Sequence, residues 1–75
     1  MNRIIYAKTE SGVDGFMKVM TTLRKKTFDI QDATMMTVSS QSDLRFVIRE
    51  KADLTAEVAV GHLRQLHDIF DVQLV

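Results

Sequence analysis

The 75-residue sequence has no cysteine, carries no formal net charge and contains no long apolar run. Without cysteine, the chain has no disulfide, no thiolate metal ligand and no cysteine nucleophile. Its 10 basic and 10 acidic residues balance, which argues against nonspecific binding to nucleic acid, because such binding rests on neutralising phosphates. No apolar run approaches the roughly 20 residues that a membrane-spanning helix needs. We therefore expect no contact with nucleic acid or membrane.

What is present is the composition of a small globular domain. Hydrophobic residues make up 45% of the sequence, which is too many for a disordered chain. A chain of this length buries only about 60% of the surface that its unfolded form exposes, so small domains without disulfides often gain core by associating. The apolar core of the segment MNRIIYAKTE is too short for a signal peptide. We expect a single domain over residues 1–75, located in the cytoplasm.

The hydrophobic pattern changes its period along the chain, and the order of these changes predicts the fold. Short apolar or alternating runs predict strands near residues 3–8, 30–38, 44–50 and 71–75. Apolar residues at helical spacing predict helices near 14–26 and 55–69, with Asp14 and Thr55 as their N-caps. The polar cluster 39–43 predicts a hairpin turn. The helix residues expected in the core are Phe16, Met17, Val19, Met20 and Leu23, and then Val58, Ala59, Leu63, Leu66, Ile69 and Phe70.

This β-α-β-β-α-β order predicts an α+β fold of the ferredoxin-like type. Right-handed crossovers place both helices on one face of a four-stranded antiparallel sheet. The second strand is expected at an edge of the sheet, and its segment Thr34, Met35, Met36, Thr37 and Val38 has no charge to protect that edge. One of the two adjacent methionines must point away from the helices. We predict that two copies pair along this edge as a homodimer.

Residues that could perform chemistry are few and do not form a recognised set. His62 and His67 are about 140° apart on a helix, so they cannot bind one metal ion as a pair four residues apart would. No nucleophile accompanies them, and Ser39, Ser40 and Ser42 are typical turn residues. The sequence has no phosphate-binding glycine loop and no Cys-x-x-Cys metal loop. We expect no catalytic residues, no metal site and no cofactor in this chain.

The RNA-recognition domain shares this order of elements but has a different function. It stacks bases on aromatic residues of its first and third strands, and Tyr6 and Phe46 are the candidates for that role here. The segment around Phe46 lacks the glycine and the paired aromatics of that domain's third strand. Phe46 also shares a strand face with Leu44 and Ile48. We therefore interpret Phe46 as a core residue.

Several segments together make the chain resemble a known family. They are a strand-to-helix turn with glycine, a first helix that ends in a basic run, the segment RKKTFDI at 24–30, and the ending LRQLHDIFDV at 63–72. This combination resembles an ACT domain, and specifically the short form of the small regulatory subunit of acetolactate synthase. That family usually has a glycine where Thr27 stands. It also has an L-x-K-L-x-D-V-like ending, which His67 and Asp68 interrupt here.

The resemblance implies a non-catalytic regulatory subunit in branched-chain amino-acid biosynthesis. Such subunits bind the thiamine-diphosphate-dependent catalytic subunit of acetolactate synthase and raise its activity. In many members they also confer feedback inhibition by valine. A free-standing ACT-domain sensor of amino acids is the alternative function.

The resemblance also implies where an amino-acid effector would bind. In the family the effector lies at the dimer interface, against a loop between the first strand and the first helix that reads N-x-P-G-[VAL]. Aligned on the second glycine, the corresponding residues are Gly12, Val13, Asp14, Gly15 and Phe16. A second alignment places the motif on ESGV at 10–13. Neither alignment supplies the asparagine that binds the amino acid, so we predict weak or absent binding of valine.

Overall fold

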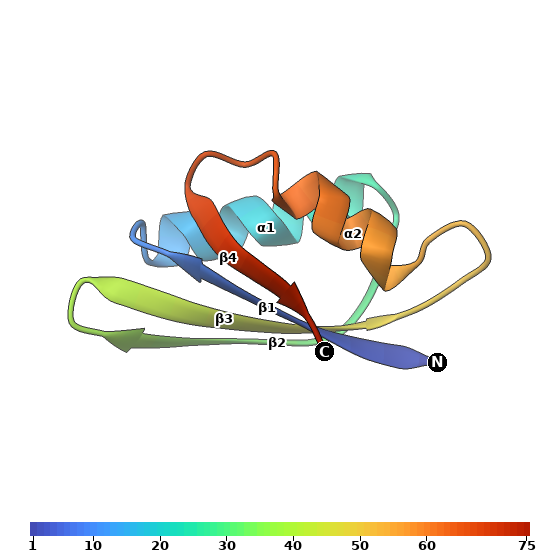
Figure 1. Cartoon of the computed structure of the whole chain (residues 1–75), viewed down its shortest axis with the longest axis horizontal. Coiled ribbons are helices and arrows are strands. Elements are labelled where there is room, and N and C mark those ends of the chain that lie inside the picture. Colours follow the sequence, from blue (N-terminus) through green and yellow to red (C-terminus); the bar gives the residue numbers. More distant parts are fainter.

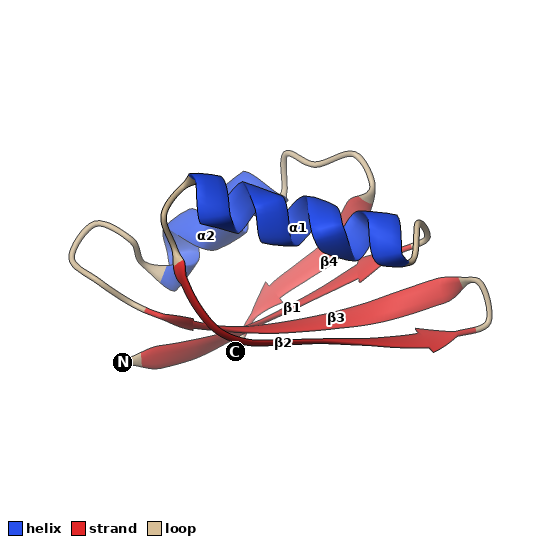
Figure 2. Ribbon diagram, turned by 180° about the vertical axis from the view of Figure 1, so that it is seen from behind, coloured by secondary structure: helices blue, strands red, loops and turns tan.

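A computed structural model describes residues 1–75, and the predicted order of elements is confirmed (Figure 1). The elements are β1 (Asn2–Thr9), α1 (Val13–Lys25), β2 (Asp29–Val38), β3 (Gln41–Arg49), α2 (Ala56–Leu63) and β4 (Ile69–Leu74). The four strands form one antiparallel sheet in the order β2-β3-β1-β4. Both helices cover the same face of this sheet and leave the other face uncovered (Figure 2). This is the predicted ferredoxin-like fold.

The core lies between the two helices and the face of the sheet that they cover. Its large, fully buried side chains are Ile5, Val19, Leu23, Leu44, Phe46, Ile48 and Leu63. Phe16 of α1 stacks on Phe46 of β3, with ring centroids 5.6 Å apart and planes inclined by 20°. This contact confirms that Phe46 is a core residue.

Most of the predicted core-facing helix residues contact the core, but three do not. The eight that are buried or pack against buried residues are Phe16, Val19, Met20, Leu23, Ala59, Leu63, Leu66 and Ile69. Met17, Val58 and Phe70 are instead 52%, 42% and 37% exposed. The short helix α2 packs through every third or fourth residue, which includes the buried Val60 and excludes Val58.

The prediction that the second helix runs to residue 69 is wrong. α2 ends at Leu63, and residues 64–68 form turns before β4 begins. The amides of Leu66 and Ile69 donate to the carbonyls three residues earlier, at 3.1 and 3.2 Å. These turns return to the core at three-residue steps, which imitates helical spacing. The pairing of Ile69 with Thr9 of β1 begins the strand two residues earlier than predicted.

The predicted hairpin turn at 39–43 is also too long. Only Ser39 and Ser40 form the turn, and Ser39 has a φ of 61°. β3 begins at Gln41, and Ser42 is buried within the strand opposite Thr37 of β2. The two hydroxyls of this pair share a hydrogen bond of 2.8 Å. Serine and threonine are also common in turns. The sequence therefore does not distinguish a buried cross-strand pair whose two hydroxyls hydrogen-bond to each other from a pair of turn residues.

The end of α1 is a Schellman motif with threonine in the position that usually holds glycine. The amide of Phe28 donates to the carbonyl of Leu23, and the amide of Thr27 donates to that of Arg24, both at 3.0 Å. Thr27 has a φ of 65°, a left-handed conformation that a β-branched side chain adopts only with strain. Phe28 and Leu23 are both in the core, so the motif turns the chain directly into β2.

We expect Thr27→Gly to stabilise the protein by about 0.5–1 kcal/mol. Relief of left-handed strain is worth roughly 1–2 kcal/mol, and the greater freedom of glycine in the unfolded chain offsets about half of it. Urea denaturation measures the change. Thr21→Gly, at an exposed position inside α1, is the matched control and should destabilise by up to about 0.5 kcal/mol. Equal losses in the two variants would contradict this account of Thr27.

An ion pair joins α1 to the turns after α2. Lys18 Nζ donates to Asp68 Oδ2 at 2.8 Å. This hydrogen bond and the positive charge of Lys18 hold the pKa of the Asp68 carboxyl below its ordinary value. Because the pKa is lower in the folded state, the pair stabilises the fold above the carboxyl's ordinary pKa. That contribution is lost as the pH falls through the folded-state pKa.

We expect Lys18→Met to raise the pKa of Asp68 toward its ordinary value and to remove this part of the acid sensitivity. A pH titration of the Asp68 carboxyl carbon by NMR measures the pKa in both proteins. Lys25→Met is the control, because Lys25 lies exposed in the same helix and belongs to none of the five ion pairs. An unchanged Asp68 pKa in Lys18→Met would show that the contact does not persist in solution.

Candidate functional site

The loop between β1 and α1 is a tight turn that depends on Thr9 and Gly12. Thr9 is fully buried, and its Oγ1 accepts a hydrogen bond from the amide of Ser11 at 3.0 Å. Gly12 occupies the N-cap position of α1 with φ 58° and ψ −130°. Side chains other than hydrogen rarely allow this conformation, so glycine makes the abrupt change from strand to helix possible.

The prediction that Asp14 caps α1 is wrong. No side chain caps this helix, and Asp14 lies one residue inside it, in the first turn. Its amide donates to the carbonyl of Ser11 at 3.2 Å, while its exposed carboxylate joins none of the ion pairs. The carboxylate acts on the helix only as a negative charge near the positive end of the helix dipole.

The other candidate effector residues divide into buried and exposed ones. Gly15 lies where α1 comes closest to β1, and a Cβ there would lie only 2.8 Å from the Cβ and Cγ2 of Thr9. Phe16 turns into the core to stack on Phe46. Val13 is 60% exposed. Of the predicted loop residues, only Val13 and Asp14 therefore present side chains to an approaching ligand.

The loop still offers unpaired backbone donors. No hydrogen bond within the protein uses the amides of Gly12, Val13 or Gly15. Amides at a helix N-terminus favour a carboxylate. No polar side chain takes the place of the family's asparagine, and all five surface depressions are lined by residues elsewhere. In a single chain, the loop can contact a carboxylate but does not enclose an amino acid.

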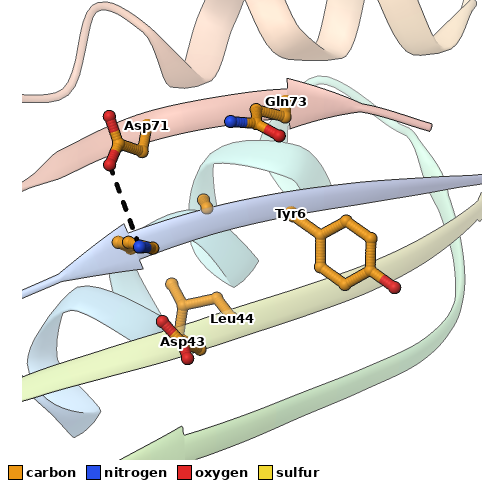
Figure 3. Close-up of a pocket in the computed structure, with 7 residues that line it drawn as sticks. Tyr6, Asp43, Leu44, Asp71 and Gln73 are labelled. Carbon is orange, nitrogen blue, oxygen red and sulfur yellow. Dashed lines mark ion pairs between the residues drawn. The ribbon is translucent and has the colours of Figure 1, made fainter.

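Two adjoining concave regions lie on the uncovered face of the sheet. Two adjoining depressions of about 340 and 290 Å³ share Tyr6, Asp43 and Leu44. Figure 3 shows Tyr6, Asp43, Asp71 and Gln73 lying across three neighbouring strands. The only ion pair drawn there joins Lys8 Nζ to Asp71 Oδ2 at 4.0 Å.

Sequence reasoning missed this group of side chains, although part of the signal was present. The alternation of β1 and β3 places Lys8 and Asp43 on the same face, directly opposite each other. Asp71 has a φ of 50° where the register of β1 and β4 shifts. Such a bulge redirects a side chain, and nothing in the sequence IFDVQL predicts a bulge at this position.

The edge strand has the predicted position. β2 forms one end of the sheet, with its outer backbone groups free of any strand. Met35 packs against the core, whereas Met36 is 67% exposed. The prediction that one of these methionines points away from the helices is therefore confirmed.

The histidines and the aromatic residues do not form a chemical site. His62 is half-buried, with its ring centroid 6.2 Å from that of Phe28. Neither histidine has an ion pair with a carboxylate, and no group of three or more potential ligands is placed to hold a metal ion. Tyr6 and Phe46 lie on opposite faces of the sheet, so they form no common stacking platform. None of the helices combines the length and the apolarity needed to cross a bilayer.

No protein-family model matches the sequence, and no curated protein matches it. Solved structures do match. The ACT domain of the GTP pyrophosphokinase of Chlorobium tepidum superposes with a TM-score of 0.82 at 13% identity, over 100% of this chain and 97% of that one. The chain has the fold of an ACT domain.

Two further solved structures are similar to this chain in fold. An uncharacterized protein of Thermotoga maritima matches with a TM-score of 0.74 at 18% identity, over 99% of this chain and 92% of that one. A formyltetrahydrofolate deformylase of Pseudomonas putida matches with a TM-score of 0.69 at 13% identity. The match covers all of this chain but 28% of the deformylase. The ACT fold therefore accounts for this whole chain but for only a part of that enzyme.

Proposed function

We propose that this chain is a non-catalytic regulatory subunit that binds and activates the catalytic subunit of acetolactate synthase. The observation that carries the proposal is the left-handed φ of Thr27. The small regulatory subunits that the sequence resembles usually have glycine at this position, and glycine is the residue that a Schellman motif favours there. A backbone conformation that favours glycine supports the alignment of the segment 24–30 with that family. The ACT fold over the entire chain supports it further.

The test is reconstitution with the thiamine-diphosphate-dependent acetolactate synthase chain of the same organism. The expected result is co-elution of the two chains and an increase in the rate at which the catalytic subunit forms acetolactate. The Chlorobium tepidum ACT domain, with the same fold and 13% identity, is the matched negative control. Failure to co-elute, together with intact binding of an amino acid, would instead favour the free-standing sensor.

The proposed regulatory unit is a homodimer paired along β2. The edge segment Thr34–Val38 carries no charge and has free backbone donors and acceptors on its outer side. Two such edges in antiparallel register form one continuous sheet, as exposed strand edges tend to do. The pairing also covers part of the exposed side chains of Met36 and Val38. β4 forms the other edge of the sheet, but it contains the charged Asp71, and its Val72 carbonyl already accepts a hydrogen bond from Arg64.

We expect valine, leucine and isoleucine to bind this protein weakly or not at all. A side-chain hydrogen bond to a charged ligand is worth roughly 1.5–3 kcal/mol, so the missing asparagine weakens binding by about ten- to a hundredfold. The unpaired amides of Gly12 and Val13 leave only contact with the carboxylate. Isothermal titration calorimetry measures the affinity.

The control for this titration is Val13→Asp. It adds a negative charge beside the free amides at an exposed position, so it should remove any residual binding without disturbing the core. Saturable micromolar binding of valine that Val13→Asp abolishes would show that the loop is a competent effector site. That result would overturn the expectation of weak feedback.

A further inference from the structure

The uncovered face of the sheet carries an unusual share of the exposed apolar side chains. We call this surface the open face and define it by Tyr6, Lys8, Met36, Asp43, Arg45 and Phe70. Nine large hydrophobic residues are exposed in the protein, and four of them, Tyr6, Met36, Val38 and Phe70, point out from strands on this side. Both figures of the whole chain show helices only on the other side. The open face is therefore free for a partner.

The register of the strands arranges the open face in rows that cross the sheet from β2 to β4. One row contains Met36, Asp43, Lys8 and Phe70, because Met36 pairs with Asp43, Asp43 with Lys8, and Lys8 with Phe70. The next row contains Thr34, Arg45, Tyr6 and Gln73 by the same pairings. Each row thus has apolar or neutral residues at its ends and its complementary groups in the middle.

Each row is complementary to the same row of a second copy that runs in the opposite direction across the sheet. A twofold axis that runs between β1 and β3, parallel to the strands, brings β1 of one copy over β3 of the other. In the first row, Lys8 then meets Asp43 of the second copy, and Met36 meets Phe70. In the second row, the Arg45 guanidinium lies over the ring of Tyr6, which is a favourable cation–π arrangement. Every contact occurs twice, as an isologous interface requires.

The charges of the open face also favour a second copy of this chain as the partner. Asp43 is exposed and belongs to none of the ion pairs within the chain, whereas Arg45 pairs with Asp32 at 3.3 Å. Lys8 has only the long 4.0 Å contact with Asp71. Lys8 and Asp43 are therefore the groups with the most to gain from a partner. A strongly basic or acidic partner would meet like charges here, whereas an identical face presents opposite ones.

We infer that two copies of this chain associate weakly through their open faces, with Lys8 of each copy paired to Asp43 of the other. Four strands about 4.8 Å apart, over roughly eight residues of 3.3 Å, give a face of about 500 Å² per chain. The total of about 1,000 Å² lies at the low end for specific interfaces. The association is therefore reversible and concentration-dependent. It goes beyond the proposed function and leaves both β2 edges free.

The test uses two single charge reversals and their mixture. Lys8→Asp places two like charges at each contact, and Asp43→Lys does the same. The dissociation constant of each variant alone should therefore be up to about tenfold higher than that of the wild-type protein. In an equimolar mixture, one copy of each variant restores opposite charges at both contacts. Sedimentation velocity and native mass spectrometry of the ¹⁵N-labelled mixture should show mixed pairs in preference to like pairs. Repulsion within one chain cannot produce this result.

Matched controls are Lys51→Asp and Asp53→Lys, which make the same charge changes in the exposed β3–α2 connection. They should associate as the wild-type protein does. Circular dichroism melts verify that all four variants fold, and Arg45→Gln replaces any reversal that does not fold. If the single variants lose one association step but still pair along β2, the β2-edge homodimer does not depend on the open-face association. Like-pairing by both variants, no preference in the mixture, or a monomeric wild-type protein at hundreds of micromolar would overturn the inference.

Discussion

Gly15→Val should destabilise this protein by about 3–5 kcal/mol, a large share of its total stability. The added Cβ overlaps Thr9, whose side chain is fully buried and already engaged with the amide of Ser11. Overpacking costs about 1–3 kcal/mol, and breaking this partly buried hydrogen bond, which leaves the buried Thr9 hydroxyl without a partner, costs about 1–3 kcal/mol more. A domain of this size has a total stability of only about 4–11 kcal/mol. Urea denaturation followed by circular dichroism measures the loss.

The chain contains its own control for this substitution. Gly61 lies exposed in α2, and a Cβ there would meet nothing within 4 Å. Gly61→Val should therefore change stability by no more than about 0.5 kcal/mol, because helix propensity favours valine slightly over glycine. If Gly15→Val and Gly61→Val were equally stable, α1 would not approach β1 as closely as the structure shows.

Lysines at Thr34 and Val38 should weaken the proposed homodimer by about a hundredfold. Antiparallel pairing of the edge segment with its own copy, centred on Met36, would place Thr34 opposite Val38, so Thr34→Lys combined with Val38→Lys sets like charges against each other twice. Such juxtaposition costs several kcal/mol at an interface, and about 3 kcal/mol corresponds to a hundredfold change in the dissociation constant. Analytical ultracentrifugation across a concentration series measures that constant.

The matched control carries the same two added charges away from the edge. Thr21 and Gln65 are exposed, the first in α1 and the second in the turns after α2. Thr21→Lys combined with Gln65→Lys should leave the dimer unchanged. A dissociation constant that is the same for the wild-type protein and for both double variants would exclude pairing along β2.

The sequence alone determined the order and type of the elements, because each depends on short-range periodicity. Alternating and helical spacing along the chain predicted the strands, the two helices and their order, and the fold that this order implies placed β2 at an edge. The interpretation of Phe46 followed from the same alternation. The resemblance to an ACT domain needed more than periodicity, since it rested on short sequence segments, and the fold itself is that of an ACT domain.

The tertiary structure decided what depends on contacts between distant segments. Leu63, Leu66 and Ile69 keep a core-facing spacing whether they lie in a helix or in consecutive turns. Only the tertiary structure shows that α2 ends at Leu63 and that Ile69 pairs with Thr9. Asp14 is a residue type that often caps helices, but the N-cap position of α1 is occupied by Gly12, which has a positive φ.

The strained positions and the open face also belong to the tertiary structure. The left-handed conformations of Thr27 and Asp71 are imposed by the helix end and the bulge around them, against the preference of the residues themselves. The rows of the open face exist only once the register of four strands is known. Local preferences act over a few residues, whereas register and close approach are determined by how the whole sheet packs against its helices.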